Sequence, residues 1–194
     1  MKHFLTLAFA VASASAFAQV DYPEASGKVF DRKHEVRVGT IKLLTGNSLD
    51  LGYERVLDRN RGFGANLLIG FDDYNSDFNQ NFSLSPYYRF YFSKSEEYGA
   101  KGMFVEGFAD FYSGKAYDYD YYYNYLPDPD SNYYYEPKKK NFFDIAAGVA
   151  LGYKWVNTIG FVLEMKAGYG RNLLQENPNA AGIFRGDFSV GYRF

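Results

Sequence analysis

Apolar and polar side chains alternate along most of this chain with the two-residue period of a β-strand. The last stretch is the clearest, because Phe184, Phe188, Val190, Tyr192 and Phe194 share one face while charged and hydroxyl side chains occupy the other. Seven earlier stretches repeat the pattern. The predicted strands cover residues 35–44, 49–57, 63–71, 82–92, 102–112, 143–155, 161–169 and 184–194.

This pattern predicts an all-β chain that folds into an eight-stranded antiparallel up-and-down transmembrane β-barrel. Most of the strands are close to the length of about 9–11 residues that crosses a hydrocarbon layer. The alternation slips once, near residues 39–41, where we expect a β-bulge. The alternative is a soluble periplasmic lipocalin-like carrier, whose apolar face would surround a ligand. Such a carrier would have to bury more aromatic bulk than a small barrel holds, so we prefer the membrane barrel.

The connections between the predicted strands alternate in length. Those after the second, fourth and sixth strands are short and cover 58–62, 93–101 and 156–160. Those after the third, fifth and seventh are longer and cover 72–81, 113–141 and 170–183, whereas the first connection is a tight turn at 45–48. Bacterial outer-membrane barrels have short periplasmic turns and long external loops, so we expect both termini in the periplasm.

The N-terminal segment predicts export. Residues 1–18 combine an early lysine, an apolar run and an Ala-Phe-Ala end, as in a secretory signal peptide. Residues 19–34 lack periodicity and are predicted to be a periplasmic leader, which leaves 35–194 for the barrel. The chain has no cysteine, which excludes disulfides and thiolate chemistry, and its 21 basic residues against 23 acidic ones argue against a nucleic-acid partner.

Aromatic residues gather at the ends of the predicted strands, where barrels of the outer membrane carry interfacial girdles. The girdle positions are Tyr53, Phe63, Phe71, Phe92, Tyr153, Trp155, Phe161, Tyr169 and Phe194. With 20 tyrosines, 19 phenylalanines and 19 glycines, the composition is also that of an aromatic-rich all-β chain.

The C-terminal strand resembles the assembly signal of bacterial outer-membrane barrels, with Asp187, Tyr192 and Phe194 at the matching positions and Ser189 where the family usually has glycine. Leu-Gly-Tyr-Glu-Arg at 51–55 is similar to a motif of an uncharacterised family of such barrels. The whole chain after the signal peptide resembles the small eight-stranded barrels typified by the OmpA membrane domain and OmpX. The resemblance implies the cell outer membrane as the location, with its lipid and the barrel-assembly machinery as partners. It leaves the activity open, because one fold supports many functions.

Charged residues on the polar strand faces are predicted to fill the barrel interior, since eight strands enclose a space just wide enough for side chains. Buried charges must pair. The predicted lumen charge network is Arg37, Glu54, Arg89, Glu106, Asp110, Asp144, Lys154, Glu164, Lys166, Arg185, Asp187 and Arg193, with Asp50 beside it. A filled interior leaves no conduit, so a small ion-conducting barrel is a further alternative rather than the preferred interpretation.

We expect no enzymatic activity and no cofactor or metal. Some small outer-membrane barrels act on lipid A, but hydrolysis by a serine usually needs a histidine base. After the signal peptide the chain has only His34, at the predicted periplasmic end rather than at the outer leaflet.

The third predicted external loop is rich in tyrosine, a residue that suits contact with sugars and proteins. The candidate surface-contact residues are Tyr117, Tyr119, Tyr121, Tyr122, Tyr123, Tyr125, Tyr133, Tyr134 and Tyr135. We therefore expect a structural or surface-contact barrel whose loop meets an extracellular protein or glycan. The alternatives are a solvated extension of the hairpin without a partner and, less favoured by its spacing, a calcium site at Asp118, Asp120, Asp128 and Asp130.

Overall fold

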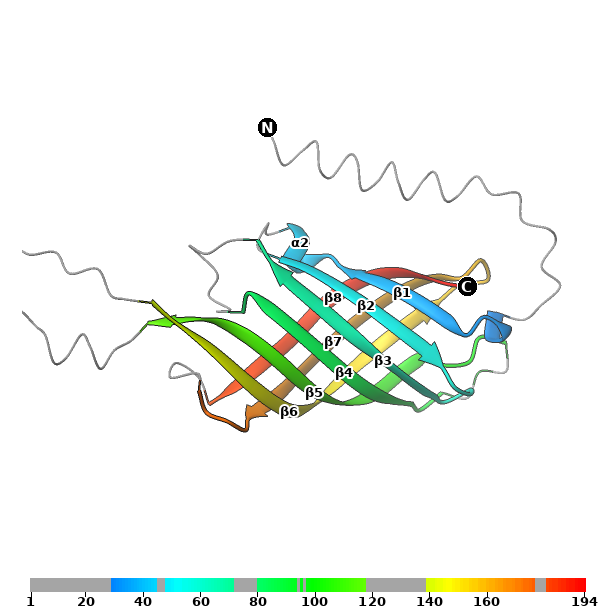
Figure 1. Ribbon diagram of the computed structural model, residues 1–194. Coiled ribbons are helices and arrows are strands. Elements are labelled where there is room, and N and C mark those ends of the chain that lie inside the picture. The colour runs from blue at the N-terminus through cyan, green and yellow to red at the C-terminus, as the bar shows by residue number, and fades with distance from the viewer. Residues whose placement is uncertain are drawn as a thin grey trace, which may run out of the picture.

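The chain forms a closed barrel of eight antiparallel strands, each paired with its neighbour in sequence and the last paired with the first (Figure 1). This computed structural model describes residues 29–44, 48–71, 80–93, 95, 97–117, 139–176 and 181–194. The strands are β1 (His34–Gly39), β2 (Ser48–Val56), β3 (Arg61–Gly70), β4 (Phe82–Tyr91), β5 (Gly102–Tyr117), β6 (Lys139–Val156), β7 (Phe161–Asn172) and β8 (Gly182–Arg193). The predicted all-β, eight-stranded antiparallel up-and-down barrel is confirmed.

The barrel closes where its first strand pairs with its last. β1 pairs with β8 from Glu35↔Arg193 to Gly39↔Ser189. Beyond that ladder, the His34 and Phe194 backbones donate to each other's carbonyl oxygens, at 3.0 and 2.8 Å. His34 is therefore the first residue of β1. A short 3-10 helix, η2 (Val29–Asp31), precedes β1.

The first predicted strand is too long. β1 stops at Gly39, and residues Ile41–Leu44 form a helical turn, α2. The chain turns because the Thr40 N–H donates to the Phe188 carbonyl oxygen at 2.8 Å and the Leu44 N–H donates to that of Thr40 at 2.9 Å. The slip in alternation thus reflects a helical turn in place of the expected bulge. Ser48, expected in a tight turn at 45–48, begins β2, and residues 45–47 lie outside the described part of the chain.

The two ends of the barrel differ. At the terminal end, where β1 begins and β8 ends, the turns 57–60, 92–101 and 157–160 join the strands. The opposite end, called the loop end here, is where the chain leaves β1, β3, β5 and β7 and enters β2, β4, β6 and β8. At the loop end β5 and β6 extend beyond the ladders that they form with β4 and β7 (Figure 1). The loop predicted over 113–141 is therefore shorter, since residues 113–117 and 139–141 are strand.

Pro86 lies within β4, where its missing N–H leaves a local gap. Residues Ser85 and Pro86 are absent from the β4–β5 ladder, which resumes at Tyr87↔Phe108. The ladder with β3 continues through Ala65↔Pro86. Side chains bridge the gap, because the hydroxyl groups of Ser83 and Ser85 both donate to Asp110 Oδ1 across it. The strand thus keeps its direction despite the lost donor.

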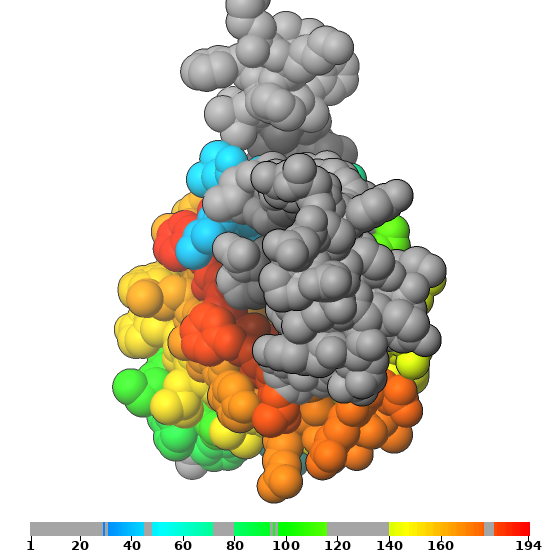
Figure 2. Space-filling view, turned by 90° about the vertical axis from the view of Figure 1, so that its left-hand side faces the viewer, coloured from blue at the N-terminus to red at the C-terminus, as the bar shows by residue number. Residues whose placement is uncertain are grey.

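The barrel is apolar outside and polar inside. Among the described residues, thirty large apolar side chains are exposed, whereas nineteen polar or charged ones are buried. Both faces follow the strand period, as in β4, where exposed and buried residues alternate without interruption. Figure 2 views the molecule from the loop end, with side chains of β6, β7 and β8 at the surface. Neither described helix has the length and apolar character of a membrane-spanning helix.

Aromatic residues form two bands on this outer surface. Around the terminal end the exposed aromatic side chains are Tyr53, Phe63, Tyr88, Phe90, Phe92, Tyr153, Trp155, Phe161 and Phe194. Around the loop end they are Phe71, Phe82, Phe111, Phe143, Tyr169 and Phe184. Between the bands the surface is largely aliphatic, as at Leu51, Leu84, Val149 and Leu151.

Candidate functional site

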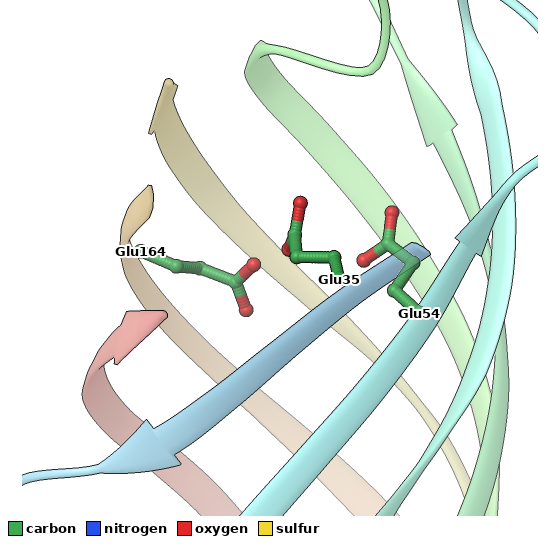
Figure 3. A group of neighbouring side chains, drawn as sticks. All are labelled: Glu35, Glu54 and Glu164. Carbon is green, nitrogen blue, oxygen red and sulfur yellow. The ribbon is translucent and has the colours of Figure 1, made fainter. Parts of the chain in front are cut away.

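The interior holds three carboxyl groups side by side. Glu35, Glu54 and Glu164 extend from β1, β2 and β7 toward one another (Figure 3), and one oxygen of each lies within 4.8 Å of the others. All three side chains are buried, with at most 1 % of their surface exposed. Three carboxylates this close repel one another strongly, so cations must lie among them.

Three cations hold the carboxylates together. Glu54 Oε2 accepts from Arg37 Nη1 at 2.8 Å, Arg89 Nη1 at 2.7 Å and Lys154 Nζ at 2.8 Å. The Arg89 guanidinium also grips Glu164 with two bonds, of 2.7 and 2.8 Å. Three positive and three negative groups therefore neutralise one another in the middle of the barrel.

Glu35 completes this arrangement from the first strand. Its Oε1 lies 2.5 Å from Arg37 Nη1 and 2.8 Å from Lys154 Nζ. Because each cation contacts at least two carboxylates, removal of a single acid leaves several charges uncompensated. Broken buried pairs of this kind are far more costly than exposed ones.

Aromatic side chains surround the charges. The Tyr91 hydroxyl donates to Glu54 Oε1 at 2.6 Å, and Arg37 Nη2 donates to the Tyr87 hydroxyl at 2.5 Å. The Arg89 guanidinium lies between the rings of Tyr87 and Phe104, 4.4 and 4.3 Å from their centroids. A glycine makes room for one of these rings, since a Cβ at Gly152 would come within 2.4 Å of the Phe104 ring. The interior is thus filled by charge and ring together.

A group of three carboxylates also raises the question of a metal ion. Here the donor set does not suit one, because the oxygen atoms that face one another already accept from guanidinium and ammonium groups. A cation placed among them would also meet three positive side chains at close range. We interpret the cluster as an ion-pair network.

A second, looser layer of charge lies toward the loop end. Arg89 Nε donates to Glu106 Oε2 at 2.6 Å, which links this layer to the first. The other oxygen, Glu106 Oε1, has Arg185 Nη1 at 3.7 Å and Lys166 Nζ at 3.9 Å, too far for hydrogen bonds. Lys166 Nζ instead donates to Asn66 Oδ1 at 3.4 Å.

The terminal end of the interior is closed by the turn between β4 and β5. Arg193 pairs with Glu35 through its Nε and Nη2 atoms, at 3.1 and 3.0 Å. The same guanidinium donates to the carbonyl oxygens of Tyr98 at 2.7 Å and Ala100 at 2.9 Å. Below it, Val29 of η2 packs on Val156 and Val162. Arg193, the last charged residue of β8, thus holds the turn at 98–100 over the opening of the barrel by hydrogen bonds.

At the loop end three aspartates accept hydrogen bonds from uncharged donors. Asp110 accepts from the two serines of β4. Asp144 Oδ1 accepts from the backbone of Ile145 at 2.7 Å and of Leu174 at 3.2 Å. Asp187 Oδ1 likewise accepts from the backbone of Phe188 at 2.8 Å. Asp50 accepts from a charged donor, Lys42 of α2, at 3.0 Å.

The structure places the predicted lumen residues inside the barrel but divides them into groups. Eight share the ion-pair network that spans both layers: Arg37, Glu54, Arg89, Glu106, Lys154, Glu164, Lys166 and Arg185. Arg193 joins it through Glu35. Asp110, Asp144 and Asp187 lie apart, where they hold serine hydroxyls, a loop and a strand end.

Three central residues were missed from the sequence: Glu35, Tyr87 and Tyr91. Glu35 shares the face of Arg37, two residues away, so the alternation itself could have indicated it. The tyrosines lie on the predicted polar face of their strand, but the alternation does not indicate that their hydroxyl groups form hydrogen bonds with Glu54 and Arg37.

The other predicted sites have separate outcomes. His34 lies at the terminal end, where its Nδ1 is 2.7 Å from the Tyr53 hydroxyl and its ring stacks on Phe194. Tyr192 is paired with Val36 in the ladder that closes the barrel. Tyr117 is the last residue of β5. The remaining tyrosines of the predicted contact loop, and the aspartates of the calcium alternative, lie outside the described residues, as does the predicted signal peptide.

Searches against family models, curated proteins and solved structures found no match to this chain.

Proposed function

We propose that this protein is a non-catalytic barrel of the bacterial outer membrane that acts as a structural element and a surface-contact protein. The observation that carries the proposal is the inverted distribution of its side chains, with apolar residues outside and buried ion pairs inside. In water such a surface would expose far more contiguous apolar area than a monomeric protein tolerates. Against lipid the same surface is favourable, and closed β-barrels are one of only two structures that can span a bilayer.

Further features support the outer membrane as the location. The apolar surface is bounded by two aromatic bands, as expected for residues at the two membrane–water interfaces. The sequence begins with the pattern of an export signal and resembles outer-membrane barrels at its aromatic C-terminal strand. On this proposal the terminal end faces the periplasm, and the loop end faces outward.

The interior supports a closed barrel. Arg89 and Glu54 are fully buried at its centre, and Arg193 ties the turn at 98–100 across the terminal end. We therefore expect no stable conductance when the folded protein is reconstituted in a planar bilayer. Control recordings would use the same lipid with a porin of known conductance. Reproducible openings of the purified barrel, of the size given by a water-filled pore, would contradict the closed interior.

The loop end supports a contact role. β5 and β6 pair as far as Tyr117↔Lys139, several residues beyond the point where β4 leaves β5 at Ser113. On a rigid barrel, binding residues tend to collect on such projections. The segment that joins the two strands is the tyrosine-rich one, and we propose that it meets an extracellular protein or glycan.

Replacing residues 118–134 with a short Gly-Ser linker is expected to abolish this contact while the barrel still folds. Cell adhesion and cross-linked partners would be compared with those of the parent protein. The matched control replaces residues 72–79, a second loop-end connection, in the same way. Both variants must first appear in the outer-membrane fraction with the heat-dependent gel mobility of a folded barrel. Unchanged adhesion and cross-linking in the first variant would contradict the contact role and leave the segment as a simple extension of the hairpin.

A further inference from the structure

The rim of the barrel at the terminal end is basic. Among its described residues, six are cationic and three are acidic. The cations are Arg32, Lys33, Arg55, Arg59, Arg61 and Lys101, and the acids are Asp31, Asp58 and Glu97. This excess lies next to the aromatic band of the terminal end, where an apolar surface gives way to water.

Arg55 faces outward from within β2 at this rim. It alternates with the buried residues Glu54 and Val56 and is itself exposed. In the ladders it stands opposite His34 on one side and Phe63 on the other. The described part of the chain offers its guanidinium no hydrogen bond or ion pair, whereas Arg37, Arg89 and Arg193 inside the barrel each make several.

The neighbours of Arg55 form an aromatic frame with one further arginine. Tyr53 precedes it on the same face and is held by His34 at 2.7 Å, and Phe63 is followed around the barrel by Tyr88. Arg61 lies diagonally across on β3, about 7–8 Å away by the usual spacing of such neighbours. The Arg61 side chain is 54 % exposed and pairs with Asp58.

The pair of Arg61 and Asp58 carries no net charge, so the positive charge of this group of residues comes from Arg55. Burial raises the pKa of Asp58, but hydrogen bonds from the Arg61 side chain and from the Asn60 backbone, together with the charge of Arg61, outweigh it and lower that pKa. Asp58 therefore stays ionised and neutralises Arg61. Among the described residues, nothing compensates the charge of Arg55 at the boundary between apolar surface and water.

We propose that the outward face of β1 to β4 at the terminal end, centred on Arg55, binds the phosphate group of an anionic phospholipid. The proposal rests on the proposed function, since it needs the barrel to lie in a membrane. A guanidinium presents paired N–H donors that match two phosphate oxygens, which an ammonium group cannot do. Tyr53, Phe63 and Tyr88 would contact the glycerol region and upper acyl chains of the same lipid, at the depth where aromatic girdles lie.

The test compares lipid retention by variants of the full barrel. Each protein is folded into vesicles with equal amounts of phosphatidylglycerol and phosphatidylcholine, then extracted gently, and the retained lipids are counted by native mass spectrometry. The parent protein should retain phosphatidylglycerol preferentially. Arg55→Gln should weaken that retention about fivefold, the effect of about one basic residue at a membrane surface. Arg55→Lys should fall between the two, because it keeps the charge and loses the paired donors.

Arg171→Gln is the matched control. Arg171 is also an exposed, outward-facing arginine, but it lies at the loop end, and the residues directly opposite it, Ala147 and Gly182, are not aromatic. Its replacement should leave phosphatidylglycerol retention unchanged. Equal retention by the parent and Arg55→Gln, or an equal loss in both glutamine variants, would overturn the lipid site. A parent barrel that does not float with the vesicles would instead overturn the proposed membrane location, so the two failures are distinct.

Discussion

Replacement of Leu151 by arginine should make folding into a bilayer about 2–4 kcal/mol less favourable, the cost of a lipid-facing arginine near the midplane of a transmembrane barrel. Leu151 is 62 % exposed and stands between Val105 of β5 and Ala167 of β7, within the aliphatic zone that separates the aromatic bands. The measurement is a reversible urea titration of the protein in vesicles, for the parent and for Leu151→Arg.

Leu57→Arg is the control for depth. Leu57 is 45 % exposed and follows β2 at the terminal rim, where an arginine should cost only about 0–1 kcal/mol. A difference between the two variants depends on the position of the substitution and cancels the general cost of losing a leucine. If both substitutions have the same small effect, as expected for the surface of a protein in water, the lipid-facing interpretation of the outer surface is wrong.

Glu54→Gln should lower the free energy of unfolding by about 3–5 kcal/mol, because it breaks a buried ion pair at its most connected member. The Glu54 carboxylate faces Arg37, Arg89 and Lys154 within 2.8 Å. A glutamine has nearly the same shape, so the loss would come from charge rather than from a cavity. The same urea titration measures it.

Glu176→Gln provides the comparison for that variant, since Glu176 is exposed in the described part of the β7–β8 connection. Exposed substitutions of this kind usually change stability by less than about 0.5 kcal/mol. A Glu54→Gln protein as stable as Glu176→Gln would show that Glu35 and Glu164 compensate the three cations unaided. The central role assigned to Glu54 would then be incorrect.

The strands and their two faces could be predicted from the sequence because a period of two leaves little choice. Once Glu106 and Asp110 are placed inside, the parity of β5 follows, and so does the exposure of Met103 and Phe111. The same logic failed for β1. Its parity appeared to slip at residues 39–41, and only the structure shows that the strand ends at Gly39 and a helical turn begins.

Gly39 shows why that change could not be predicted. A Cβ there would lie 2.0 Å from Asp187 Oδ2, a residue that is distant in sequence but adjacent around the closed barrel. The turn is also fixed by bonds from Thr40 to the Phe188 carbonyl oxygen. These contacts depend on how β1 and β8 are staggered, which the alternation of either strand alone does not specify.

The composition of the interior could be predicted, but its pairing could not. Buried charges had to be neutralised, and the residues concerned lay on the polar strand faces. Which acid meets which base depends on the register of all eight strands, as when Lys154 reaches Glu54 one hundred residues earlier in the chain. The division between a tight central network and the separate aspartates of the loop end follows from the same three-dimensional stagger.

Trp155 offers the most direct measurement of the central claim, that the outer surface of the barrel lies in a membrane. It is the only tryptophan of the chain, is 42 % exposed, and packs beside Tyr153, with the two rings tilted by 44°, in the terminal-end aromatic band. In vesicles its fluorescence should be quenched strongly by phospholipids brominated near the headgroup, less by those brominated at the chain end, and hardly by iodide in the water. Efficient quenching by iodide, with none by either brominated lipid, would contradict the membrane-spanning barrel.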